Sequence, residues 1–292
     1  MSHIRNLLHN PPTNEPAPVG VVAPPVSEHT AFVPHVAESA STFSSASTGV
    51  APSIPEFAVE KAELRAGSRV IYYSDPRSPA ADRFRLLRMR LKTHWSAGKL
   101  KKLLIASPLA HDGKTTTILN LATALAERNK RRVLVLEADL HHSHIAEVLR
   151  LKPWAGLTEC LLEDTVSPLS AVRRIEPLGW YLLPAGEPRR NPTELLQSPA
   201  FAQIIQKVSS GFDWILIDSP PVMALTDAIS IQQHADASLL VVRAGETPRE
   251  VVDQTVALLG KKNVVGVVLN GVEARNHIYY GYYGGNRDSQ DY

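Results

Sequence analysis

The chain has 292 residues, of which 44% are apolar and 21% charged, and its formal net charge is +2. That length allows one sizeable α/β core with residues left over, and the near-neutral charge gives no general attraction to nucleic acid. The single cysteine, Cys160, excludes an internal disulfide and fits a reducing cytosol, and its apolar neighbours favour core packing over a catalytic thiol.

Residues 1–65 are the part left over. They hold nine of the 22 prolines, many Ser, Thr and Ala, and no Tyr or Trp. Such a composition cannot bury enough apolar area to offset chain entropy. We therefore expect a disordered arm over residues 1–65, a folded domain over 66–275 and a flexible tail over 276–292. The first residues lack the apolar core of a signal peptide, and no run approaches the roughly 18 apolar residues of a membrane span.

Residues 78–95, SPAADRFRLLRMRLKTHW, predict an amphipathic helix that Ser78 caps. One face carries an apolar stripe formed by Phe84, Leu87, Leu91 and Trp95. The other face carries Arg83, Arg85, Arg88, Arg90 and Lys92. A solvated face is the default interpretation of such a run, but arginine's planar fork suits carboxylates across a subunit interface or anionic lipid equally well.

Residues 103–128 predict a buried strand, a turn ending in Gly-Lys-Thr-Thr and an amphipathic helix. Backbone N–H groups in such a turn converge on a polyphosphate at the helix N-terminus. Lys114 would reach the β- and γ-phosphates, and the Thr115 hydroxyl would hold Mg²⁺, so ATP and Mg²⁺ are the expected cofactors. The candidate cofactor-binding residues are Ala110, His111, Asp112, Gly113, Lys114, Thr115 and Thr116. The loop is irregular, because Pro108 stands where the general pattern has Gly; an ordinary strand-to-helix turn is the alternative.

Two later apolar strands end in acidic residues. Residues 131–145 contain a strand followed by Glu137 and Asp139, and residues 212–222 contain a strand ending in Asp218. Carboxylates at the carboxyl ends of parallel strands face the crevice where α/β sheets bind ligands. Asp218 would hold a metal-bound water, and Asp139 would approach the γ-phosphate and either the metal or the attacking nucleophile. Each acid alone could be a solvated strand end, but three strand-end signals in this order favour one site.

Two further strands are expected at residues 237–245 and 263–271. The second ends in Asn270, whose side chain could pair with an adenine edge or simply form a turn before Gly271. The histidines at 141, 142 and 144 have no accompanying Cys, so a polar loop is favoured over a metal site there.

The end of the chain is rich in tyrosine and glycine. Five of the eight tyrosines lie in its last fourteen residues: Tyr279, Tyr280, Tyr282, Tyr283 and Tyr292. The interspersed glycines disfavour a helix or strand, so packing does not easily explain these hydroxyls. A tyrosine strip beside an ATP site suggests a phosphorylation substrate; the alternative is an aromatic tail that binds a partner.

With these motifs in place, residues 70–292 resemble the bacterial tyrosine autokinases encoded with capsule and exopolysaccharide machinery. The segment SPAADRFRLLR, with Asp82, Arg85 and Arg88, is similar to the family's oligomerisation helix. LLIASPLAHDGKTT, VLVLEAD and WILIDSPP are similar to its phosphate loop and its two acidic motifs, and the Tyr-Tyr-Gly-Tyr-Tyr tail also matches. The chain departs from the family at four places: Asp82 replaces Glu, Ala110-His111 replace Pro-Gly, Glu137 replaces Asp, and His141 replaces Arg.

The resemblance implies a three-layer α/β P-loop NTPase fold with a mostly parallel sheet, and catalysis by Lys114, Asp139 and Asp218, with metal ligands Thr115, Asp139 and Asp218. It implies a ring of subunits, each presenting its tail to a neighbour's site, a tyrosine phosphatase, and a separate membrane-bound protein that controls polysaccharide chain length. The protein would then be cytoplasmic and peripheral at the membrane.

Two other functions stay open. One is a dimeric ATPase switch of the partitioning or septum-site type, although such proteins have a lysine where this chain has Leu109. The other is a nucleotide-binding regulator with little catalysis, which the replacements at Glu137 and His141 allow.

Overall fold

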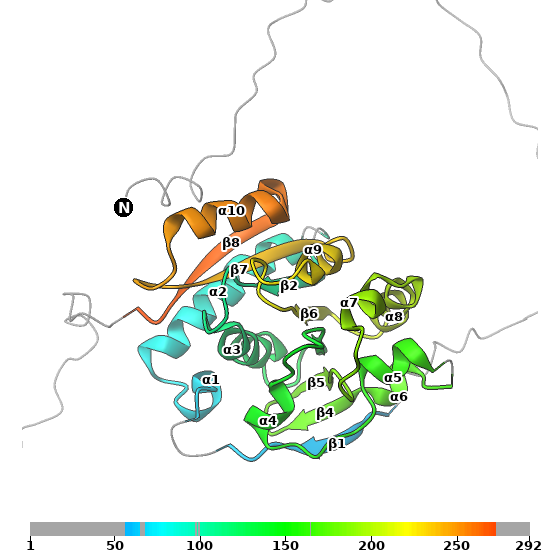
Figure 1. Cartoon of the computed structure of the whole chain (residues 1–292). Helices are drawn as coiled ribbons and strands as arrows, with labels where there is room; N and C mark the ends of the chain where they lie inside the picture. The colour runs from blue at the N-terminus through cyan, green and yellow to red at the C-terminus, as the bar shows by residue number, and fades with distance from the viewer. Residues whose placement is uncertain (1–55, 65–67, 97, 99, 164, 273–292) are drawn as a thin grey trace, which may run out of the picture. The chain divides into compact units, whose positions relative to one another are not determined.

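The computed structural model describes residues 56–64, 68–96, 98, 100–163 and 165–272, and they form an α/β fold around one eight-stranded sheet (Figure 1). The strand order is β1-β4-β5-β3-β6-β2-β7-β8. The strands are β1 (Ala58–Lys61), β2 (Lys102–Ala106), β3 (Val133–Glu137), β4 (Arg173–Glu176), β5 (Trp180–Leu183), β6 (Trp214–Asp218), β7 (Ala237–Arg243) and β8 (Val264–Asn270). All neighbouring strands pair in parallel except β4 and β5, which are antiparallel.

The helices lie on both faces of the sheet, which confirms the expected three layers (Figure 1). The helices are α1 (Ile71–Ser74), α2 (Pro79–Ser96), α3 (Lys114–Ala126), α4 (Ile145–Leu149), α5 (Leu157–Leu162), α6 (Pro168–Ala171), α7 (Pro192–Gln197), α8 (Pro199–Ser209), α9 (Asp227–Gln232) and α10 (Arg249–Leu259), with a 3₁₀ turn at Lys261–Asn263. One hydrophobic core contains side chains of α2, α3 and α4, and the other contains side chains of α5, α7, α8 and α9.

The three central strands β3, β6 and β2 are almost continuously buried, as their runs of apolar residues predict for strands covered on both faces. In α2 the Ala81 N–H donates to the Ser78 hydroxyl at 3.2 Å, so the predicted cap is present. The predicted stripe also packs inward, with Leu91 buried and Phe84, Leu87 and Trp95 partly buried against the core.

Strand β1 corrects the expected boundary of the arm. It lies inside residues 1–65, yet it pairs in parallel with β4 from Ala58 to Lys61. Its four residues do not alternate between buried and exposed side chains, so the sequence pattern does not indicate a strand. Its conformation follows from the pairing with β4. The sheet therefore begins before residue 66, and of the expected arm only residues 1–55 and 65 lie outside the part that the structure describes.

The structure bears on the expectations for the cysteine and for membrane-spanning segments. Cys160 packs partly buried against the core, and burial raises the pKa of its thiol to about 11, which agrees with a packing role. Within the described residues, none of the helices combines the length and the hydropathy that a membrane crossing requires.

Candidate active site

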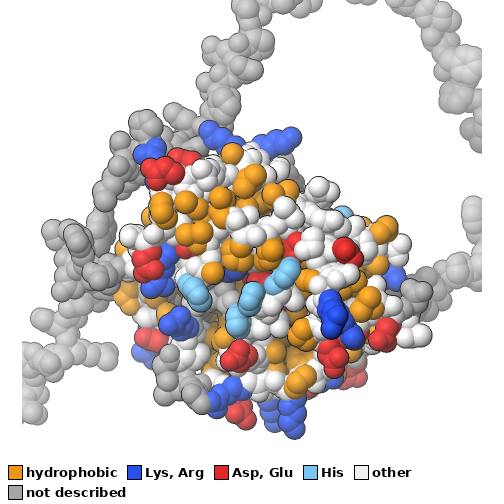
Figure 2. All heavy atoms as spheres, in the orientation of Figure 1, with side chains coloured by type: hydrophobic (Ala, Val, Ile, Leu, Met, Phe, Trp, Pro, Cys, Tyr) orange, Lys and Arg blue, Asp and Glu red, His pale blue; other side chains and the backbone are white. Residues whose placement is uncertain are grey.

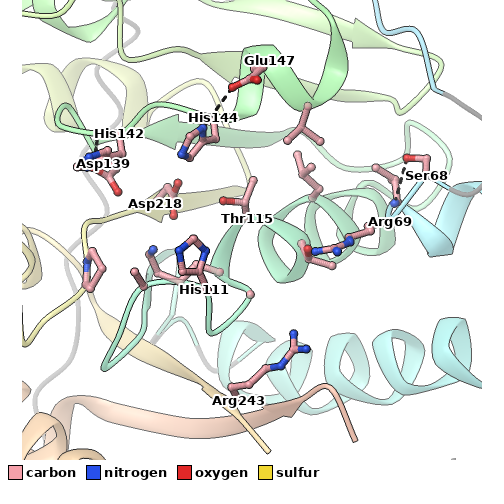
Figure 3. Close-up of a pocket in the computed structure, with 18 of the residues that line it drawn as sticks. Ser68, Arg69, His111, Thr115, Asp139, His142, His144, Glu147, Asp218 and Arg243 are labelled. Atoms are coloured by element: carbon pink, nitrogen blue, oxygen red, sulfur yellow. Dashed lines mark hydrogen bonds and ion pairs between the residues drawn. The ribbon is translucent and has the colours of Figure 1, made fainter. Parts of the chain in front are cut away.

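A pocket of about 1240 Å³ lies where β2, β3 and β6 end, at the N-terminus of α3 (Figure 3). It brings together eight residues that the sequence analysis selected: Ala110, His111, Gly113, Lys114, Thr115, Thr116, Asp139 and Asp218. Parallel strands β3, β2 and β6 end side by side, with Glu137 paired to Asp218 and Ile105 also paired to Asp218. Three strand-end signals that are far apart in the sequence therefore meet in one cavity.

The loop from Ser107 to Gly113 turns the chain from β2 into α3. Gly113 adopts φ +98°, and a Cβ at this position would lie 1.9 Å from Nδ2 of Asn270, so only glycine fits. His111 also has a positive φ, +66°, a conformation that costs a non-glycine residue roughly 1 kcal/mol. The helix then begins at Lys114, which leaves its first N–H groups directed at the pocket.

The two strand-end carboxylates are both buried. Asp139 is 5% exposed and Asp218 is 4% exposed. Asp139 Oδ1 accepts a hydrogen bond from the His142 N–H at 3.0 Å. Burial raises the pKa of Asp218 to about 7, against the lowering effect of the Lys114 ammonium. Within the described residues, Asp218 Oδ1 has no hydrogen-bond partner, which is unusual for a buried carboxylate oxygen.

These groups fit a magnesium ion that binds together with a nucleotide. Mg²⁺ prefers hard oxygen ligands and is usually held by one or two carboxylates together with substrate phosphates. The Thr115 hydroxyl and the carboxylates of Asp139 and Asp218 offer such oxygens. Asp218 Oδ1 has no hydrogen-bond partner among the described residues, so it is available as a ligand. No group of three His, Cys, Asp or Glu side chains among the described residues could hold a metal by itself, so the nucleotide would have to supply ligands.

Glu137 and His141 do not line this pocket. Oε1 of Glu137 accepts the N–H groups of His144 and Ile145 at 2.9 and 2.8 Å, and Oε2 accepts that of Ala185 at 3.1 Å. Burial raises the pKa of Glu137, while these three N–H groups oppose the rise. The carboxylate therefore fixes the loop that carries Asp139.

His141 contacts α9 instead of lining the pocket. Its Nε2 lies 2.8 Å from Oδ2 of the fully buried Asp227, at the start of α9. The two replacements in the second acidic motif thus position backbone and side chains around the pocket instead of lining it.

Asp112 and Asn270 also differ from their predicted placement, since neither lines the pocket. Asp112 is 3% exposed and its side chain faces the protein. The Asn270 amide donates to the Asp112 carbonyl at 2.9 Å, a contact that differs from both the adenine edge and the simple turn. Binding of adenine by Asn270 stays a prediction.

Comparison with known proteins gives the family. The model of the CobQ/CobB/MinD/ParA nucleotide binding domain matches residues 103–281. Tyrosine-protein kinase YwqD of Bacillus subtilis (strain 168) is 30% identical over 217 residues, which cover 74% of this chain and 91% of that protein. The chain belongs to the bacterial tyrosine-protein kinase family.

Two further matches have a similar identity to the chain. The succinoglycan biosynthesis transport protein ExoP of Rhizobium meliloti (strain 1021) is 29% identical over 228 residues, but the match covers only 29% of that longer protein. The BceF tyrosine kinase domain is 29% identical, with a TM-score of 0.63, and the match covers 71% of this chain and 85% of that one.

The segment that resembles an oligomerisation helix makes its contacts within the chain. Arg85 pairs with Asp82 at 2.5 Å and donates to the Pro76 carbonyl. Arg88 donates to the Ala124 carbonyl in α3 at 3.1 Å and to the Tyr72 hydroxyl at 3.3 Å. The expectation of a free arginine face is therefore wrong for Arg88, because this part-buried side chain ties α2 to α3. A role of these residues between subunits stays a prediction.

The pocket also contains residues that the sequence analysis did not select. Arg69 and Arg243 line it from segments before α2 and at the end of β7, and Figure 3 shows them on different sides of Thr115. Further lining residues are Glu63, Ser68, His142, His144, Glu147, Arg150 and Glu246. Figure 2 shows histidine side chains gathered on this face of the molecule. Arg243 ends an apolar strand, and this position could have marked it as a pocket residue. The sequence around Arg69 contains no comparable pattern.

The predicted phosphate acceptors Tyr279, Tyr280, Tyr282, Tyr283 and Tyr292 lie outside the described residues. The structure therefore does not test the assignment of the tail as substrate.

Proposed function

We propose that this protein is an ATP-dependent protein-tyrosine kinase that phosphorylates its own C-terminal tyrosine cluster. The observation that carries the proposal is the single pocket in which Lys114 and Thr115 at the start of α3 lie with the buried carboxylates of Asp139 and Asp218. Membership of the tyrosine-protein kinase family supports a tyrosine hydroxyl as the acceptor.

In the proposed reaction the tyrosine oxygen forms a bond to the γ-phosphorus, and the bond from that phosphorus to the β–γ bridging oxygen breaks, releasing ADP. Lys114 neutralises charge on the transferred phosphoryl group, and the N–H groups at the start of α3 orient the phosphates. Asp139 accepts the phenolic proton late, because a loose transition state demands little of a base. Mg²⁺, when bound through Thr115 and Asp218, supplies further positive charge and aligns the phosphates.

The wider proposal is regulatory. Subunits of a ring would phosphorylate one another's tails, a tyrosine phosphatase would reverse the reaction, and the cycle would control polymerisation and export of an exopolysaccharide or capsule. The name of the Rhizobium relative, a succinoglycan biosynthesis transport protein, supports a polysaccharide setting. A separate membrane-bound chain-length determinant would hold the kinase at the inner face of the cell membrane.

The test is mass spectrometry of the purified full-length chain after incubation with Mg-ATP. We expect phosphate between residues 279 and 292 in the wild type and none in Lys114→Met, Asp139→Asn or Asp218→Asn. Release of ADP without tail phosphate would support the ATPase switch, and neither product would support a regulator without catalysis. Wild-type turnover in both aspartate variants would refute the site assignment.

A further inference from the structure

The phosphate loop is held by side chains that come from three separate parts of the chain. Asp112 Oδ2 accepts the Leu109 N–H at 2.9 Å across the loop, and its Oδ1 accepts the Thr247 hydroxyl at 2.6 Å. The backbone carbonyl of Asp112 accepts the Asn270 amide at 2.9 Å. One buried residue is thus bonded to its own loop, to the turn after β7 and to the end of β8.

The direction of the bond from Thr247 is fixed by its other contact. Its Oγ1 accepts the Arg243 N–H at 3.1 Å, so the hydroxyl proton is available for Asp112. A charged acceptor makes such a bond stronger than a neutral pair. Arg243 itself lines the pocket, so this chain of two hydrogen bonds joins a lining residue of the pocket to the phosphate loop.

The loop needs this support because its own sequence does not favour its shape. Pro108 occupies the position where the general pattern has Gly, and His111 adopts a positive φ of +66°. Gly113, at φ +98°, lies directly against the Asn270 side chain. Strained backbone of this kind persists only where surrounding contacts determine it.

We propose that Asp112, Thr247 and Asn270 form a loop clamp, a set of positioning residues that holds the phosphate loop in its nucleotide-binding conformation before the nucleotide arrives. The inference rests on the nucleotide-binding part of the proposed function and does not require tyrosine transfer. If the clamp is weakened, only a fraction of molecules has a competent loop, and the apparent affinity falls by that fraction.

The test is calorimetric titration of the full-length chain with ADP and Mg²⁺. Thr247→Val keeps the side-chain shape but removes the hydroxyl, and we expect the Kd to rise roughly tenfold, as for loss of one charge-assisted hydrogen bond. Thr247→Ser, which keeps the hydroxyl, should return the Kd to within about twofold of wild type. In the kinase assay Thr247→Val should raise KM for ATP while kcat at saturation is retained.

Thr255→Val is the matched control. Thr255 is buried where Thr247 is partly buried, and its hydroxyl donates to the Val251 carbonyl inside α10. Its Kd should equal that of wild type even if its melting temperature falls. Asp112→Asn is the second variant, since it preserves size but turns an amide N–H₂ toward a donor, and it should weaken ADP binding more than Thr247→Val.

An unchanged Kd in both Thr247→Val and Asp112→Asn, or an equal loss in Thr255→Val, overturns the loop clamp. A wild type that binds ADP but never phosphorylates its tail contradicts the proposed kinase function and leaves the clamp supported by the Kd series. A wild type that binds no ADP contradicts both.

Discussion

Replacement of Asp218 by asparagine should abolish phosphoryl transfer and yet stabilise the nucleotide-free protein at neutral pH. Burial raises the pKa of Asp218 from 3.8 to about 7, so the folded chain holds its proton more tightly than the unfolded chain does. The shift is about 3 pKa units, and each unit corresponds to about 1.36 kcal/mol. Ionising Asp218 in the folded protein therefore costs about 4 kcal/mol of stability, and asparagine avoids that cost.

The pH dependence follows from the sign of the shift. Below about pH 4 the carboxyl is protonated in both states, so it has no cost. Between pH 4 and 7 only the unfolded chain releases the proton, and the wild type loses stability as the pH rises. Above pH 7 the loss is complete. The advantage of Asp218→Asn over wild type should therefore grow from pH 5 to pH 7 and level off at pH 8.

The assay is urea unfolding of both proteins without nucleotide at pH 5, 6, 7 and 8. Asp253→Asn, which changes a carboxylate that is 72% exposed and lies 3.6 Å from Nε of Arg249 on α10, is the control for loss of a surface charge. A stability difference that is the same at all four pH values, or a wild type that is more stable than Asp218→Asn at pH 8, would refute the reasoning.

Four further outcomes are expected. Gly113→Ala should abolish ADP binding, measured by calorimetry, because its Cβ would lie 1.9 Å from Asn270 Nδ2. His111→Val should be about 1 kcal/mol less stable than His111→Gly in urea unfolding, since a β-branched residue tolerates φ +66° poorly; equal stability would contradict the strain. Arg88→Ala should lose about 1–2 kcal/mol through its bonds to Ala124 and Tyr72, whereas the exposed Arg83→Ala should lose less than about 0.5 kcal/mol in the same assay. Glu137→Leu should destabilise by about 2 kcal/mol, because it leaves three backbone N–H groups without their acceptor; an unchanged urea midpoint would show that those bonds contribute little.

The sequence predicted the parts of the fold that depend on local patterns. The apolar runs of β2, β3 and β6 and the stripe of α2 follow from burial on one or both faces, so they were detectable without the structure. The acids at the ends of those strands were found for the same reason, because strand ends in a parallel sheet share one edge.

The sequence could not predict contacts between distant segments. An aspartate at position 112 could face a nucleotide or another side chain, and the sequence alone does not distinguish the two. Its actual partner, Thr247, is 135 positions away in the sequence. Glu137 is an acid at the end of a strand like Asp218, but its side chain accepts backbone N–H groups of His144 and Ala185 instead of lining the pocket. Such roles depend on the distance between elements, which hydrophobic periodicity does not encode.

Strand β1 determines where this kinase can be shortened for laboratory work. Phe57, just before β1, packs its ring 5.1 Å from that of Tyr181 and 5.6 Å from that of Phe212, and the Ala62 N–H donates to the Glu176 carbonyl at 2.7 Å. A truncation that starts at residue 66 would remove these contacts and leave the backbone groups of β4 open to a strand from another molecule. Protein made in that way should aggregate, and fragments intended for crystallisation should begin before Phe57.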